Sequence, residues 1–112
     1  MRPLKPRKSV YDLFNEGPLR WAKYKLFGYR TRATGRAVSV TQPKLANCFC
    51  LLGALKFVYP DANERRNATR RLVRAINRRD FFGWTAPSTI WEYNDEKATY
   101  ETLLETVKEA RV

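Results

Sequence analysis

The residues best suited to binding chemistry are arginines that recur at helical spacing in the middle of the chain. Residues 62–79 predict one helix, on which Arg66, Arg70, Arg74 and Arg78 stand four residues apart and form one row. Each guanidinium is a planar set of hydrogen-bond donors that suits phosphate or carboxylate oxygens. Because like charges at this spacing destabilise an isolated helix, the row indicates that a partner or another part of the chain neutralises it.

The residues of this helix that we expect to contact an anionic partner are the arginines on or beside that row: Arg66, Arg70, Arg71, Arg74, Arg78 and Arg79. The alternative is internal pairing, because Glu101, Glu105 and Glu109 form an acidic row on the last predicted helix. Three carboxylates would compensate these arginines only in part, so both interpretations stay open. Nothing in the helix indicates readout of base edges, so the sequence does not choose between DNA and RNA or between single and double strands.

A second basic segment, residues 20–32, interleaves cations with aromatic rings. Its candidate binding residues are five cations and one ring: Arg20, Lys23, Lys25, Arg30, Arg32 and Tyr29. In a single-strand site, rings stack on bases while cations hold the backbone. The alternative places the rings in the core, with the cations reaching solvent along them, and for Trp21 we favour the core.

The positive charge is concentrated in the first 80 of the 112 residues. Residues 1–80 carry 19 Lys and Arg against 5 Asp and Glu, whereas residues 81–112 carry 3 against 6, and the formal net charge is +11. This asymmetry indicates nucleic acid, a nucleoprotein complex or an acidic protein surface as the partner. No apolar stretch is long enough to span a bilayer and no signal peptide is visible, so we expect no membrane partner and a cytoplasmic location. The oligomeric state stays open.

Residue types that support catalysis or hold metals are scarce. The chain has no histidine and only two cysteines, Cys48 and Cys50, so a four-ligand zinc site lacks donors. A nucleophilic Cys50 would need a nearby base, and its apolar surroundings should raise its pKa. Asn94 and Asp95 precede the last predicted helix and are interpreted as a turn and N-cap. We therefore expect no catalytic residue, no metal and no cofactor, and a binding protein rather than an enzyme.

These side chains must be positioned by a mainly α-helical fold. Ser9 predicts the N-cap of a short first helix, and Pro43 predicts the start of a helix over residues 44–58. That segment is apolar on nearly every side, so it should be central, and Gly53 within it indicates that another helix packs closely there.

The predicted organisation is one domain preceded by an arm. We expect residues 1–8 to form a flexible basic arm and residues 9–112 to form a compact helical bundle. The bundle has about four helices around the central apolar one, with a minor β-hairpin allowed within residues 29–41.

Three short motifs resemble a known family. Cys50-Leu-Leu-Gly-Ala-Leu55 is followed about 40 residues later by Ile90-Trp-Glu-Tyr-Asn-Asp95, and Gly35-Arg-Ala-Val38 lies upstream. The pattern resembles that of small uncharacterised bacterial and phage proteins with a Trp-Cys-x-x-Gly-Ala-Leu helix and an Ile-x-x-Trp-Asn-Asp turn before an amphipathic helix. Phe49 and Tyr93 depart from it, since each stands where that family has Trp. The resemblance implies a shared fold over roughly residues 9–110, no assigned reaction and, through its phage members, an accessory or host-inhibiting role.

The function expected from these observations is that of a small basic, non-enzymatic binding protein. It would engage nucleic acid or a nucleoprotein complex through the arginine-rich helix and, if phage-encoded, act in the bacterial host cytosol. Such binding would be sufficient for an inhibitor of a host defence or nucleic-acid machine, similar to an anti-CRISPR protein. The alternative is a protein-interaction module whose arginines meet an acidic protein surface without nucleic-acid contact, with residues 81–84 supplying aromatic contacts.

Overall fold

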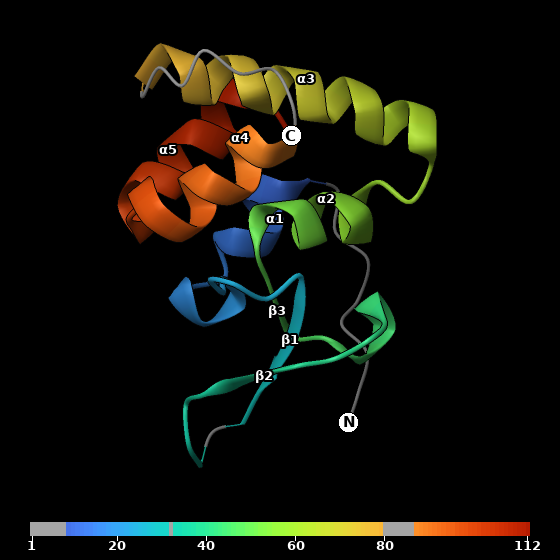
Figure 1. Ribbon diagram of the computed structural model, residues 1–112, viewed down its shortest axis with the longest axis vertical. Coiled ribbons are helices and arrows are strands. Elements are labelled where there is room, and N and C mark those ends of the chain that lie inside the picture. Colours follow the sequence, from blue (N-terminus) through green and yellow to red (C-terminus); the bar gives the residue numbers. More distant parts are fainter. Residues whose placement is uncertain (1–8, 32, 80–86) are drawn as a thin grey trace.

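A small sheet and the long helix α3 lie at opposite ends of the molecule, with the other helices between them (Figure 1). The computed structural model describes residues 9–31, 33–79 and 87–112. The α-helices of these residues are α1 (Val10–Phe14), α2 (Leu51–Val58), α3 (Ala62–Arg79), α4 (Pro87–Glu92) and α5 (Tyr100–Ala110). The strands are β1 (Phe27–Arg30), β2 (Ala37–Ser39) and β3 (Cys48–Phe49). The predicted arm over residues 1–8, the side chain of Arg32 and the aromatic segment 81–84 lie outside the described residues.

The sheet is antiparallel, with strand order β2-β1-β3. β1 and β2 form the hairpin that the sequence allowed, with Gly28 opposite Ser39. Gly35 supplies the turn at φ +65°, a left-handed conformation that glycine adopts without steric cost. The fold is therefore mainly α-helical, as predicted. It is not a four-helix bundle, because the helices share the domain with a three-stranded sheet.

The predicted helix over residues 44–58 is wrong in its first half. Residues 43–45 form a 3-10 turn, Cys48 and Phe49 form β3, and only Leu51–Val58 are helical. The side chain of Asn47 accepts from Arg30 N at 2.7 Å and donates to Arg30 O at 2.8 Å, which ties this stretch to β1. Pairing with β1 therefore outweighs the helical preference of an apolar run that sequence periodicity cannot assign by itself.

Gly53 lies where close packing was predicted, but its neighbour is not another helix. A Cβ at this position would overlap the carbonyl oxygen of Leu26, in the segment that leads into β1. The missing side chain allows the backbone at Leu26 to lie directly on α2. The expectation of close approach was thus right, whereas the expected partner was wrong.

The core is formed by the inner faces of the helices and by Phe49 of β3. Its largest fully buried side chains include Phe14, Phe49, Leu51, Leu55, Leu72, Ile76, Ile90 and Leu103. Ser9 caps α1 as predicted, since its side chain accepts from Asp12 N at 2.9 Å. Asp61 caps α3 in the same way through Glu64 N at 2.9 Å. These caps satisfy amides that a helix end leaves without intrahelical partners.

Candidate functional site

The predicted arginine row lies on the exposed face of α3. Arg66, Arg70, Arg74 and Arg78 are all exposed, and α3 runs along one end of the molecule over α4 and α5 (Figure 1). At a rise of about 1.5 Å per residue, their backbone positions are about 6 Å apart and span about 18 Å along the helix axis. The row therefore presents a line of cations to solvent rather than to the core.

The opposite face of α3 explains why this helix forms despite its charge. Leu72, Ala75 and Ile76 are fully buried, and α3 packs against α2, α4 and α5. Burying a Leu or Ile side chain contributes about 1.5–3 kcal/mol, whereas each like-charged pair at four-residue spacing costs only about 0.2–0.5 kcal/mol. The free energy gained by burying these side chains thus exceeds the repulsion within the row. The helix does not require a neutralising partner for its stability.

The acidic row of α5 meets the arginine row at one end. Arg78 Nε lies 3.9 Å from Glu109 Oε1, and both side chains keep substantial exposure, 62% and 37%. An exposed pair at this distance contributes about 0–1 kcal/mol. Within the described part of the chain, Arg66, Arg70 and Arg74 form no ion pair. Internal pairing therefore accounts for part of the row only.

Arg65 and Arg71, which flank the row, have structural contacts. Arg71 donates from Nε to Ala110 O at 3.2 Å and from Nη2 to Arg111 O at 3.3 Å, so it caps the end of α5. Arg65 donates from Nη1 to the carbonyls of Tyr59 and Pro60 at 3.0 and 3.1 Å. Arg71 therefore has a structural role in the fold, and its contact with a partner stays a prediction. The side chain of Arg79 lies outside the described residues.

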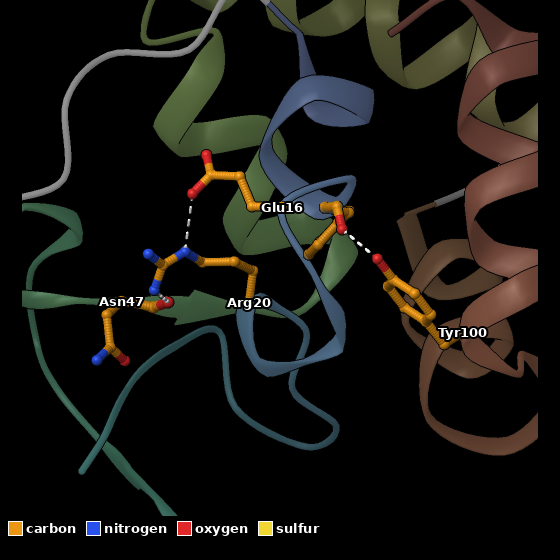
Figure 2. A network of polar contacts seen from close by, with 5 residues as sticks. Glu16, Arg20, Asn47 and Tyr100 are labelled. Carbon is orange, nitrogen blue, oxygen red and sulfur yellow. Dashed lines mark hydrogen bonds and ion pairs between the residues drawn. The ribbon is translucent and has the colours of Figure 1, made fainter. Parts of the chain in front are cut away.

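In the second predicted segment, both described arginines are bonded internally. Arg20 lies between Glu16 and the backbone carbonyl of Asn47, with Nε–Oε1 and Nη1–O distances of 3.2 and 3.1 Å (Figure 2). Arg30 donates to Gly35 O at 2.6 Å and to Trp21 O at 3.0 Å. The contacts of these two arginines tie the segment to Asn47 and to the β1–β2 hairpin, so neither guanidinium is presented to solvent as those of the row are.

The other candidates of this segment are divided between core and surface. Trp21 is half-buried against the core, as favoured from the sequence. Lys23 is exposed, with Nζ 5.4 Å from the centroid of the Trp21 ring. Lys25 and Tyr29 are half-buried. Among the cations of this segment that the structure describes, Lys23 alone is exposed, and it is separate in sequence from α3.

Asn94 is a structural residue that the sequence interpretation missed. It is fully buried in a π-helical turn, Tyr93–Lys97, that continues α4. Its Oδ1 accepts from Trp21 Nε1 at 2.6 Å and from Leu51 N at 3.0 Å. Its Nδ2 donates to Ala22 O at 3.1 Å and to Asp95 Oδ1 at 2.8 Å. All four hydrogen-bonding positions of the amide are used, so Asn94 joins three distant segments.

The predicted N-cap at Asn94 and Asp95 is correspondingly wrong. Thr99 caps α5, in a reciprocal pair with Thr102. Asp95 Oδ1 instead accepts from Tyr24 N at 2.8 Å, and Tyr24 stands at φ +63°. The tyrosine hydroxyl donates to Glu96 Oε1 at 2.9 Å, and this bond raises the pKa of Tyr24. The sequence signal that could have indicated an internal role was the position of Asn94 directly after the apolar residues Ile90, Trp91 and Tyr93.

The surroundings of both cysteines favour the neutral thiol over the thiolate. Both are buried free thiols, and burial raises the pKa of each. Cys50 caps α2, with its Sγ accepting from Gly53 N at 3.5 Å. Among the described residues, no group of three His, Cys, Asp or Glu side chains could hold a metal ion. No helix of these residues is long and apolar enough to cross a bilayer.

The comparison with known families gives a family without a known activity. The model of a family of unknown function (DUF6197) matches residues 19–111. This range includes the motifs on which the resemblance to uncharacterised proteins was based, whereas α1 precedes it. No curated protein and no solved structure matches the chain.

Proposed function

This chain belongs to that family of unknown function, and we propose that it binds nucleic acid through the arginine row of α3. The observation that carries the proposal is the exposure of Arg66, Arg70 and Arg74, which form no ion pair with any described carboxylate. Arg78 extends the row, and its exposed contact with Glu109 is weak enough to exchange for a phosphate. The net charge of +11 adds long-range attraction for a polyanion.

The contacts would be to the phosphate backbone rather than to base edges. Four guanidinium groups about 6 Å apart along one helix face can each bind phosphate oxygens, in one or two hydrogen bonds. Such contacts position a protein on nucleic acid and carry no sequence information by themselves. We therefore expect binding without marked sequence preference.

The salt dependence follows from the number of phosphates. Neutralising about four phosphates of duplex DNA predicts a slope of roughly −3.6 for log K against log salt, so affinity should fall roughly a hundredfold between 50 and 200 mM salt. A protein bound in this way can block access to its nucleic acid or displace it from another protein. Inhibition of a nucleic-acid machine, which the resemblance to phage proteins implies, is an extension of the same proposal.

The test is a fluorescence-anisotropy titration with labelled duplex DNA, single-stranded DNA and structured RNA at several salt concentrations. We expect Arg70→Glu with Arg74→Glu to reduce binding of the preferred polymer to background with circular dichroism unchanged. The matched control is Arg36→Glu with Lys44→Glu, which makes the same charge change at two exposed cations away from α3. Equal losses in both double variants would show that net charge alone binds the polymer and would refute the α3 site. Absence of binding to all three polymers at low salt would refute nucleic-acid binding itself.

A further inference from the structure

A groove between α2 and α3 combines an aliphatic floor with a cationic rim. Its volume is about 620 Å³, and its lining comes from the segment before β1, from α2 and from α3, and includes Leu26, Leu52, Lys56, Arg66, Thr69 and Arg70. The described lining contains no acidic and no aromatic side chain. The groove therefore offers apolar burial and positive charge together.

A second depression, of about 670 Å³, lies beside Arg20 and Arg30. The guanidinium groups there already donate to Glu16 and to backbone carbonyls. It therefore has few free donors for a ligand. The groove between α2 and α3 is the better candidate because Lys56, Arg66 and Arg70 are exposed and form no ion pair within the described part of the chain.

The floor is exposed for a reason built into the fold. Because Gly53 has no side chain, the backbone at Leu26 rests on α2, and this contact places Leu26 beside Leu52 at the groove. Leu26 keeps 38% of its surface exposed, and Leu52 is half-buried. The hydroxyl of Thr69 donates to Arg65 O at 2.7 Å, so this donor already has an acceptor within the protein. The floor is thus free to receive apolar side chains.

We propose that this groove docks an acidic amphipathic helical segment of a partner protein. Apolar side chains of the segment would contact Leu26 and Leu52, and its carboxylates would pair with Lys56, Arg66 and Arg70. Helices bind grooves in this way through apolar anchors at i, i+3 or i+4 and i+7. The charge of the rim selects acidic over basic segments and speeds association.

Two other occupants fit the groove less well. Nucleic acid in a single-strand site stacks its bases on aromatic side chains, and this described lining is aliphatic. A second copy of the chain would bring together two molecules that each carry a net charge of +11. An acidic partner is attracted by the same charge. The docking site does not depend on nucleic-acid binding, although both would use Arg66 and Arg70.

The probes are fluorescein-labelled 15-residue peptides that carry three leucines and have glutamate at the other positions. In some peptides the leucines stand at i, i+3 and i+7, and in others at i, i+4 and i+7. Peptides of the same composition with shuffled leucines are the controls. We expect at least one patterned peptide to bind at least tenfold more tightly than its shuffled control. Chemical shifts of ¹⁵N-labelled protein should change at the groove residues of α2 and α3. Failure of every patterned peptide to exceed its control, or shift changes confined to other elements, would overturn the proposal.

Variants separate the groove from the arginine row. Leu26→Ser with Leu52→Ser should weaken the patterned peptide about tenfold and leave nucleic-acid binding unchanged. Leu19→Ser with Val38→Ser, at exposed apolar residues elsewhere, is the control and should leave the peptide affinity unchanged. If both pairs weaken the peptide equally, or if the Leu26 and Leu52 pair abolishes nucleic-acid binding instead, the groove is not a peptide site. The shift measurement on the unchanged protein keeps the test valid if a variant misfolds.

Discussion

Replacing Gly53 by alanine should destabilise the protein, although glycine inside a helix is normally a cost. On helix propensity alone, the change would stabilise α2 by about 1 kcal/mol. In the fold, the added Cβ would overlap the carbonyl oxygen of Leu26 and lie 2.8 Å from its carbonyl carbon. Both are backbone atoms, so no side-chain rotation relieves the contact. Either α2 or the backbone leading into β1 must move.

The magnitude follows from what such a movement disturbs. Phe27 directly follows Leu26 and packs edge-on against Phe49, with ring centroids 6.3 Å apart. Overpacking a well-filled core costs about 1–3 kcal/mol, and contact with backbone places Gly53→Ala near the upper end of that range. After the propensity gain is subtracted, the expected net loss is about 2 kcal/mol. For a domain of this size, that loss lowers Tm by roughly 10 °C.

The assay is thermal and urea unfolding followed by circular dichroism. Lys56→Ala and Lys56→Gly are the controls, because Lys56 is an exposed residue of the same helix. The difference in stability between these two variants measures helix propensity without steric overlap. We expect glycine to be the less stable residue at position 56 and the more stable residue at position 53. A Gly53→Ala protein as stable as the parent would refute the proposed contact between Leu26 and α2.

Asn94→Ala should destabilise the protein by about 2–4 kcal/mol in urea unfolding, because it leaves Trp21 Nε1, Ala22 O and Leu51 N, in two other segments, without this partner. A loss below about 1 kcal/mol would contradict this. Arg71→Ala should lower the unfolding free energy by about 1 kcal/mol through loss of the α5 cap, whereas Arg74→Ala should change it by less than about 0.5 kcal/mol. Burial raises the folded-state pKa of the Cys48 and Cys50 thiols. Because the thiols of the unfolded chain then ionise first, the two cysteines contribute their full stabilisation below about pH 8.5 and lose it as the pH rises further. The unfolding free energy should therefore fall more between pH 7.5 and pH 9.5 for the parent than for a Cys48→Ala, Cys50→Ala variant. Equal falls would contradict the raised pKa of the two thiols.

The helices with strong local patterns were predictable from the sequence. α3 occupies the predicted residues 62–79, because its apolar residues recur every three to four positions and Asp61 provides a cap. α5 has the same kind of periodicity through Leu103 and Val107. In both, local preference and tertiary burial agree. The arginine row faces solvent for the same reason, because the apolar residues of α3 occupy its other side.

The parts that the sequence did not predict depend on contacts between distant residues. Cys48 and Phe49 belong to an apolar run that favours helix locally, but they pair with β1 about 20 residues earlier. Asn94 resembles a cap when only its neighbours are considered, but three of its four hydrogen-bond partners lie 43 or more residues away. Likewise, nothing local distinguishes Arg71, which caps α5, from Arg70, which faces solvent. One sequence does not indicate which of two neighbouring arginines has a carbonyl within reach.

The bonds of Asn94 also bear on the order in which the protein folds. Three of these four bonds connect residues separated by 43, 72 and 73 positions, so each of these three closes a long loop of chain. Loop closure costs entropy that is recovered only after both ends are held in place. α3 and α5, which depend on local hydrogen bonds, can form before that point. We infer that the amide becomes buried late, so loss of its bonds would mainly accelerate unfolding and leave the folding rate nearly unchanged.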